Sequence, residues 1–163
     1  MAARASRPAE DTSAREIVIT RVFDAPRELV FEAWSEQRHV EQWWGPTGFS
    51  CTFERFELRR GGEWVFVMHG PDGRDYPNYH RFEEVVRPER LVYSHGGGRK
   101  GDNSDFVSTV TFEAQGNKTR VTMRALFSSA AERDRVVEEY GAIEGGKQHL
   151  ERLGEYLARM SRQ

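Results

Sequence analysis

The spacing of hydrophobic positions changes along the chain, and each spacing predicts a different kind of element. Residues 16–23 are rich in β-branched side chains and predict a first strand. After a proline that suits the first turn of a helix, apolar residues recur at helical spacing as far as Trp34. A second short helix is expected from about residue 37 to Trp44, where Gly45 and Pro46 end it.

Beyond residue 46 the pattern predicts six further strands joined by turns. Apolar and polar side chains alternate within them, so that Trp64, Phe66 and Met68 share one face. The turns contain Gly, Pro, Asn or Asp and leave no room for crossover helices, so neighbouring strands are expected to pair antiparallel as a meander. The expected strands are 49–58, 63–69, 79–86, 91–94, 106–113 and 119–127.

The C-terminal part predicts a helix with one apolar stripe. Ser129 and Glu132 form a capping-box pattern, in which each side chain satisfies a free backbone donor of the first turn. Gly141 predicts a break or a bend, because glycine inside a helix costs about 1 kcal/mol relative to alanine. The stripe needs an apolar surface to pack on, and the inner face of the meander offers one. Its residues are Val136, Tyr140, Ile143, Leu150, Leu153, Leu157 and Met160.

Composition narrows the class of protein. The 163 residues include 24 Lys and Arg against 26 Asp and Glu, and the basic residues are scattered, so no nucleic-acid partner is expected. The single cysteine, Cys51, excludes an internal disulfide and is expected to be a buried thiol. No segment is long and apolar enough for membrane insertion, and a cytoplasmic location is expected. Residues 1–15 are expected to be a disordered tail and residues 16–163 a single domain.

No motif in the chain indicates a particular reaction, so the sequence assigns no catalytic residue. The five histidines lack the spacing of a recognised metal site, and neither a metal nor a cofactor is expected. The glycine-rich segment 95–103 lacks the strand-to-helix context of a phosphate-binding loop, and it is interpreted as a flexible hairpin loop.

Several short motifs, taken together, resemble one family. They are Phe23-Asp-Ala-Pro26, Trp43-Trp-Gly-Pro46, Arg59-Arg-Gly-Gly62, Val67 to Gly73, Arg87 to Leu91 and Ala142 to Gln148. From about Glu16 to Met160 the chain resembles the START-related SRPBCC superfamily, in the AHSA1-like branch named for the activator of Hsp90 ATPase. The resemblance implies an α+β helix-grip (Bet v 1-like) fold, with a seven-stranded antiparallel sheet around a long C-terminal helix and two short helices after the first strand. It also implies a hydrophobic cavity between sheet and helix.

The apolar faces of the sheet and the helix supply the residues expected to bind a ligand in that cavity. Gly145 and Gly146 remove side chains where the stripe would otherwise fill the gap, so either the backbone approaches the sheet closely there or space is left for a ligand. The expected ligand-binding residues are Trp44, Trp64, Phe66, Met68, His80, Phe82, Tyr93, Phe112, Met123, Phe127, Tyr140, Ile143, Lys147 and Leu150.

Two of these candidates, Lys147 and His80, are polar, and each has both a structural and a functional interpretation. Lys147 falls on the expected inward face of the helix, where it either reaches the edge, pairs with Glu144 or Glu84, or receives an anionic or carbonyl-bearing ligand. His80 shares parity with Phe82 and is either a polar anchor, an exposed strand residue, or the acid/base group of a cyclase.

The adjacent tryptophans also have two interpretations. Helical spacing places Trp44 inward and Trp43 toward the rim of the cavity. Alternatively, both indoles clamp the small helices onto the sheet, because a tryptophan with one apolar and one polar flank suits either role.

Three functions therefore remain open. The first is the binding of a hydrophobic small molecule, aromatic or polyketide-like. The second is an enzyme that catalyses cyclisation, dehydration or hydrolysis in the same cavity. The third is an Hsp90-type chaperone interaction, which is the less expected role because the eukaryotic activator carries a separate N-terminal domain, whereas only a short tail precedes the domain here.

Overall fold

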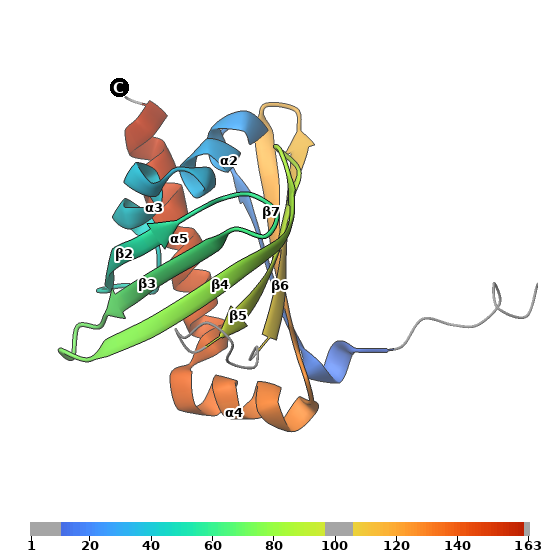
Figure 1. Cartoon of the computed structure of the whole chain (residues 1–163). Coiled ribbons are helices and arrows are strands. Elements are labelled where there is room, and N and C mark those ends of the chain that lie inside the picture. Colours follow the sequence, from blue (N-terminus) through green and yellow to red (C-terminus); the bar gives the residue numbers. More distant parts are fainter. Residues whose placement is uncertain (1–10, 97–105, 162–163) are drawn as a thin grey trace, which may run out of the picture.

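The sheet has seven antiparallel strands, and the helices pack against it (Figure 1). In order across the sheet the strands are β1 (Glu16–Phe23), β7 (Lys118–Phe127), β6 (Phe106–Gln115), β5 (Arg90–Gly96), β4 (Asp75–Val86), β3 (Glu63–His69) and β2 (Ser50–Phe56). The structure is a computed structural model that describes residues 11–96 and 106–161. Strands β2 to β7 form the expected meander, and β1 joins it by pairing with β7.

The helices follow the order predicted from the sequence. They are the 3-10 helix η1 (Ser13–Arg15) and the α-helices α2 (Arg27–Ser35), α3 (Gln37–Trp43), α4 (Ala130–Tyr140) and α5 (Ala142–Ser161). Figure 1 shows α5 running along the sheet, with α2 near its C-terminal end and α4 at the opposite end. This arrangement is the helix-grip α+β fold, in which the sheet wraps around the long C-terminal helix.

The C-terminal helical region is divided at one glycine. Ser129 caps α4, where its hydroxyl accepts a hydrogen bond from the backbone N–H of Glu132 at 3.1 Å. Gly141 ends α4 in the left-handed region at φ 58°, which glycine adopts without steric cost. Of the two outcomes expected at this glycine, the structure has the break.

A short helix that the sequence did not predict precedes the first strand. Residues 13–15, which were expected to belong to the disordered tail, form η1. The guanidinium of Arg15 donates a hydrogen bond to the backbone carbonyl of Phe127 at 2.8 Å, which holds η1 against the end of β7. Residues 1–10 of that expected tail lie outside the described residues, as do residues 97–103 of the expected glycine-rich loop.

Strand β4 begins earlier than the sequence pattern predicts. Pro77 and Asn78 are typical of turns, so the strand was expected from residue 79, whereas it starts at Asp75. Pro77 lies opposite Val67 of β3 and has no described partner strand on its other side, so its missing N–H removes no ladder bond. This early part of β4 contributes directly to the site.

The apolar stripe of α5 completes the core. Leu150, Leu153 and Leu157 are each at most 3% exposed and belong to the same buried cluster as Trp34 and Phe112. Burial of side chains of this size contributes about 1.5–3 kcal/mol each, which fixes the helix against the sheet. Within residues 11–96 and 106–161, no helix combines the length and the hydropathy needed to cross a membrane.

Candidate functional site

A cavity of about 270 Å³ lies between the inner face of the sheet and the first turns of α5. Ligand pockets usually measure about 300–1,000 Å³, so this one suits a compact ring system. Its lining residues are Ile17, Ile19, Trp44, Gly45, Pro46, Met68, Asn78, His80, Tyr93, His95, Phe106, Ser108, Met123, Ala125, Phe127, Val136, Ala142, Gly145, Gly146 and His149.

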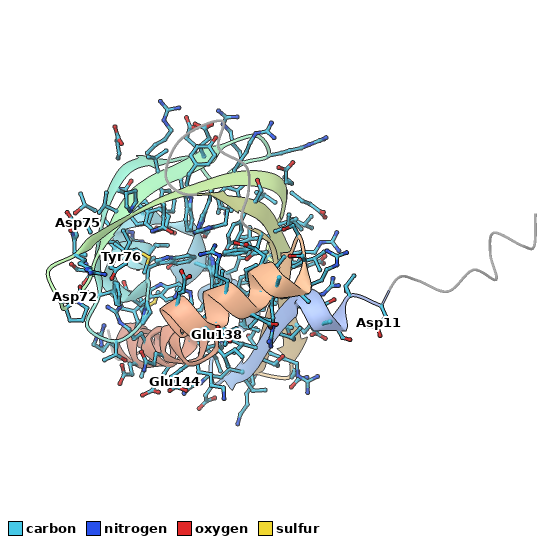
Figure 2. The ribbon with its side chains drawn as sticks, turned by 90° about the horizontal axis from the view of Figure 1, so that it is seen from below. Asp11, Asp72, Asp75, Tyr76, Glu138 and Glu144 are labelled. Atoms are coloured by element: carbon cyan, nitrogen blue, oxygen red, sulfur yellow. The ribbon has the colours of Figure 1, made fainter. Side chains whose placement is uncertain are left out.

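The cavity continues into a second hollow of about 540 Å³ near the surface. Pro46, Met68, Asn78, His95, Phe106 and Val136 line both spaces. The outer hollow is also lined by Asp75 and Tyr76 at the start of β4 and by Glu139 of α4. Figure 2, seen from below, shows Asp75 and Tyr76 to one side of α4, at this end of the molecule. Together the two hollows connect the inner cavity with the protein surface between β4 and α4.

Most of the predicted ligand residues fall into two groups. Those that line the cavity are Trp44, Met68, His80, Tyr93, Met123 and Phe127. Those that are at most 1% exposed but contribute to the core instead of the cavity wall are Trp64, Phe66, Phe82, Phe112 and Leu150. Alternation along a strand identifies the inner face, but it does not show where that face meets a helix and where it meets empty space.

The candidates on the helix side do not line the cavity where the structure describes their side chains. Lys147 is exposed and does not line the cavity, and Ile143 is half-buried outside it. The buried stripe of α5 runs through His149, Leu150 and Leu153, and Lys147 lies about 100° from its centre, at about 100° of rotation per residue. The side chain of Tyr140 lies outside the described part of the structure.

The two neighbouring glycines of α5 play different roles. A Cβ on Gly146 would come within 2.2 Å of the Ile19 side chain, so here the helix backbone approaches the sheet closely. A Cβ on Gly145 would meet only Pro46, at an ordinary 3.5 Å, where the cavity leaves room. The helix backbone thus approaches the sheet closely at Gly146, whereas Gly145 leaves space in the gap.

The tryptophan pair is more deeply buried than predicted. Trp43 is 0% exposed and its indole N–H donates to the carbonyl of Ala33 at 2.9 Å, so its expected place at the rim is wrong. Trp44 faces inward as predicted and lines the cavity. The Trp44 ring lies edge-on to that of Trp34, with 5.6 Å between centroids. Trp43 and Trp44 therefore also hold the small helices against the core.

His149 connects α5 with the loop that follows α3. The backbone N–H of Gly45 donates to its Nδ1 at 3.0 Å, so the neutral ring carries its proton on Nε2. Nε2 is buried and has no hydrogen-bond partner among the described residues. The wall therefore contains one buried donor without an acceptor.

Arg152 holds the same loop from the next turn of α5. One of its guanidinium nitrogens, Nη1, donates to the backbone carbonyls of Trp44, Gly45 and Pro46 at 2.9, 3.1 and 3.0 Å. Charge-assisted bonds of this type are about twice as strong as neutral ones. They fix the backbone that positions the Trp44 indole in the cavity wall.

His95 and Asn78 form a polar pair on the opposite wall. The amide N–H of Asn78 donates to the carbonyl of Tyr76 at 2.8 Å, which leaves its Oδ1 to accept from Nε2 of His95 at 2.7 Å. Nδ1 of His95 is then an acceptor, and it has no partner in the described part of the chain. The His95 ring stacks on Phe106 at 4.5 Å, which holds it in place.

His80 lies deeper, between aromatic rings. Its ring stacks on that of Tyr93, with 4.3 Å between centroids, and lies 5.0 Å from that of His95. The residue is 2% exposed, and its Nδ1 has no hydrogen-bond partner among the described residues. It is therefore a polar group on the cavity wall and not an exposed strand residue.

Burial keeps all three imidazoles uncharged at neutral pH. It lowers the pKa of His95 to about 4 and that of His149 to about 3, where the charge of Arg152 contributes as well. Burial also holds the pKa of His80 well below its ordinary value, and charge on the other two rings would lower it further. The described wall of the cavity is thus uncharged and mainly apolar, and three neutral imidazoles are among its lining residues.

These three histidines do not form a metal centre. In the part of the chain that the structure describes, only Glu32, Glu36 and His39 bring three potential ligand atoms within 4.8 Å of one another. That cluster lies outside the cavity, on α2 and α3.

Sequence reasoning missed several residues of the wall. The sequence pattern placed Asn78 just before a strand, His95 in the glycine-rich loop and Phe106 at the start of a strand, and it connected neither these residues nor His149 with the cavity. A signal did exist for His149, since it lies three residues after Gly146 on the glycine-containing face of the helix. No local signal identified Asn78, because its position depends on the unexpected extension of β4.

Comparison with known proteins assigns the family. The family model described as "Activator of Hsp90 ATPase homolog 1-like protein" matches residues 24–158. The chain belongs to this AHSA1 family. Its fold therefore supports a ligand-binding module or a module like the Hsp90 ATPase activator. No curated protein matches the chain significantly.

Solved structures agree with this assignment. A protein from Arthrobacter aurescens, solved by NMR, is 28% identical, with 93% of this AHSA1-like chain and 90% of that chain covered at a TM-score of 0.82. A crystal structure from Mycobacterium smegmatis is 26% identical, with 89% and 91% covered at a TM-score of 0.78. A crystal structure from Nitrosomonas europaea is 25% identical, with 93% and 99% covered at a TM-score of 0.80.

Proposed function

We propose that this AHSA1-like protein binds a hydrophobic small molecule, aromatic or polyketide-like, in the cavity between the sheet and α5. The supporting observation is a cavity of about 270 Å³ with a mainly apolar wall, in which the lining residues His80, His95 and His149 each have one buried ring nitrogen without a hydrogen-bond partner among the described residues. Buried polar atoms in proteins are nearly always hydrogen-bonded. A bound molecule with a matching polar group would supply the missing partners.

The hydrogen-bond network defines the chemistry of that molecule. Nε2 of His149 is a donor and Nδ1 of His95 is an acceptor, because each ring's other nitrogen is already engaged. A hydroxyl group both donates and accepts, so it suits this wall better than a hydrocarbon alone. The ligand is expected to be neutral, because none of the described residues that line the inner cavity carries a charge that would compensate for the burial of another.

Binding accounts for the histidines better than acid/base catalysis does. A general base works best when its pKa lies near the operating pH. The depressed pKa of His80, caused mainly by burial, makes it a weak base at neutral pH. The enzyme alternative predicts turnover that is lost when His80 is replaced by alanine, and finding such turnover would replace the binding proposal.

The test is a titration with 2-naphthol and with naphthalene, followed by amide chemical shifts of the full chain. Both probes are expected to perturb Trp44, Met123 and His149, with tighter binding for the hydroxylated probe. Ala125→Leu, which fills part of the cavity, is expected to abolish binding. Thr122→Leu, on the same strand but on the outer face, is the matched control and is expected to leave binding unchanged.

Two outcomes would contradict the proposal. One is a set of shifts confined to outer-face residues such as Val18 and Val107; the other is binding that persists in Ala125→Leu. Thermal unfolding of both variants shows whether each is folded. Saturable association with a bacterial Hsp90 that survives Ala125→Leu would favour the chaperone role. The proposal places the protein in the cytoplasm, which cell fractionation checks.

A further inference from the structure

A second polar cluster lies away from the cavity, where α2 meets α3. Glu32 lies in the last turn of α2, Glu36 separates the two helices, and His39 lies in the first turn of α3. Tyr156 of α5 packs against His39, with 5.6 Å between ring centroids. A hollow of about 560 Å³ adjoins the cluster and is lined by Glu32, His39 and Tyr156 among others.

His39 is held with one nitrogen facing the two carboxylates. Its Nδ1 lies 2.5 Å from the hydroxyl of Tyr156, which fixes the ring. Its Nε2 lies 3.3 Å from an oxygen of Glu32 and 3.9 Å from an oxygen of Glu36. The residue is only 6% exposed, yet Nε2 forms no hydrogen bond of normal geometry with any described residue. A buried nitrogen directed at two carboxylates, without a hydrogen bond, is a second observation that points to a ligand.

The spacing of these atoms fits a tetrahedral metal shell. Zinc binds histidine nitrogen at about 2.0–2.1 Å and carboxylate oxygen at about 2.0–2.2 Å, so neighbouring ligand atoms lie about 3.3 Å apart. The distance between Nε2 of His39 and Glu32 agrees with this value. The distance to Glu36, 3.9 Å, is about 0.6 Å longer than the ideal value, and the Glu36 side chain is 42% exposed and free to adjust.

We propose that Glu32, Glu36 and His39 bind a divalent first-row metal ion of the zinc type. Two carboxylate oxygens and one imidazole nitrogen form a donor set that suits such ions, and the adjoining hollow gives solvent access to a fourth position. Tyr156 orients the imidazole from outside the shell, as residues behind a metal-bound histidine commonly do. The sequence predicted no metal because the three residues span a helix junction and match no recognised motif.

An arginine competes for one of the carboxylates. Nε of Arg38 lies 2.8 Å from the same oxygen of Glu36 that faces His39. The Arg38 side chain is 71% exposed, and an ion pair this exposed contributes little, so a metal ion displaces it readily. Removal of this arginine therefore strengthens metal binding.

The alternative is a metal-free ion pair between protonated His39 and the two glutamates. The two interpretations differ in their response to Arg38→Gln, which leaves every ligand in place. A metal site gains affinity for Zn²⁺ in this variant, whereas an ion pair acquires none.

The experiment is a calorimetric titration of the full chain, free of affinity tags and treated with chelator, with ZnCl₂. The unmodified protein is expected to bind one Zn²⁺. Glu32→Gln and His39→Asn are expected to lose binding, and Tyr156→Phe is expected to weaken it about 10- to 100-fold. Arg38→Gln is expected to bind more tightly. Because Glu32 is 43% exposed, Glu32→Gln is expected to fold normally, which circular dichroism confirms.

The matched control is His69→Gln, which removes the other histidine paired with an acidic residue, Asp75, at 2.8 Å. It is expected to leave Zn²⁺ affinity unchanged. Zn²⁺ is also expected to raise the unfolding temperature of the unmodified protein but not that of Glu32→Gln. The proposal is overturned if the unmodified protein does not bind Zn²⁺, if Glu32→Gln binds equally well, or if His69→Gln abolishes binding.

Discussion

Nδ1 of His149 accepts a hydrogen bond from the backbone N–H of Gly45 at 3.0 Å, and this bond joins α5 to the loop after α3. Both residues line the cavity, so the bond closes one part of its wall. Arg152 supports the same loop through the carbonyl of Gly45 at 3.1 Å. The wall of the cavity and the anchoring of the small helices thus depend on the same contacts.

Removing the acceptor on His149 is expected to destabilise the protein. In His149→Leu the N–H of Gly45 stays buried without a partner, which costs about 1–3 kcal/mol of unfolding free energy. His149→Asn keeps an acceptor oxygen near the position of Nδ1 and is expected to be the more stable of the two variants. Urea unfolding measures both, and equal or greater stability of His149→Leu would contradict the role of this bond.

The free energy of unfolding is expected to fall as the pH drops below about 6.5. The unfolded chain binds protons on its histidines near that pH, whereas in the folded chain burial lowers the pKa of His95 to about 4 and of His149 to about 3. The stabilising effect of the neutral rings is therefore complete above pH 6.5 and is lost below it. Each fully buried imidazole contributes a slope of about 1.4 kcal/mol per pH unit.

Urea unfolding at pH 7, 6 and 5 measures this slope. His149→Asn removes one of the titrating groups, so its unfolding free energy is expected to depend less steeply on pH. Stability that stays constant from pH 7 to pH 5 would show that the imidazoles are accessible to protons in the folded state.

Two glycine substitutions are expected to have opposite effects. Gly141→Ala places a Cβ on a residue at φ 58°, where L residues are strained by about 1–2 kcal/mol. Gly145→Ala puts a Cβ at 3.5 Å from Pro46 and improves helix propensity by up to about 1 kcal/mol. Thermal unfolding measures both variants: the unfolding temperature is expected to fall in Gly141→Ala and to rise in Gly145→Ala. A change in the same direction in both would contradict this prediction.

Cys51 is expected to be unreactive in the folded protein. Burial raises the pKa of its thiol to about 12, and its sulfur lies 3.7 Å from the carbonyl of Trp44. Because the thiolate is the reactive form, a disulfide reagent at pH 8 is expected to label the native chain slowly and the urea-unfolded chain rapidly. Equal labelling rates in the two states would refute this prediction.

The metal-ion proposal and the cavity proposal are independent of each other. The metal-ion cluster lies at the junction of α2 and α3 and against the last turns of α5, whereas the cavity is lined by the sheet, the loop after α3, Val136 of α4 and the first turns of α5, and the two share no lining residue. Loss of Zn²⁺ binding in Glu32→Gln is therefore expected to leave 2-naphthol binding unchanged.

The amino-acid sequence by itself determined the elements and their order. Alternation along the strands, the glycine at position 141 and the stripe through Leu150 and Leu153 are local patterns, and each follows from the geometry of a single strand or helix. Alternation also marked the inner faces of the strands correctly, because burial selects apolar side chains wherever the sheet meets the helix.

Only the tertiary structure decided which inner-face residues surround empty space. Phe112 and Tyr93 follow the same rule of alternation, yet the first is core and the second is cavity wall, since the gap depends on how far α5 is held from the sheet. Long-range contacts such as Gly45 with His149 and Gly146 with Ile19 set that separation, and they join residues about 100 positions or more apart in the chain. No local periodicity encodes the separation between α5 and the sheet, so the residues that line the cavity follow only from the tertiary structure.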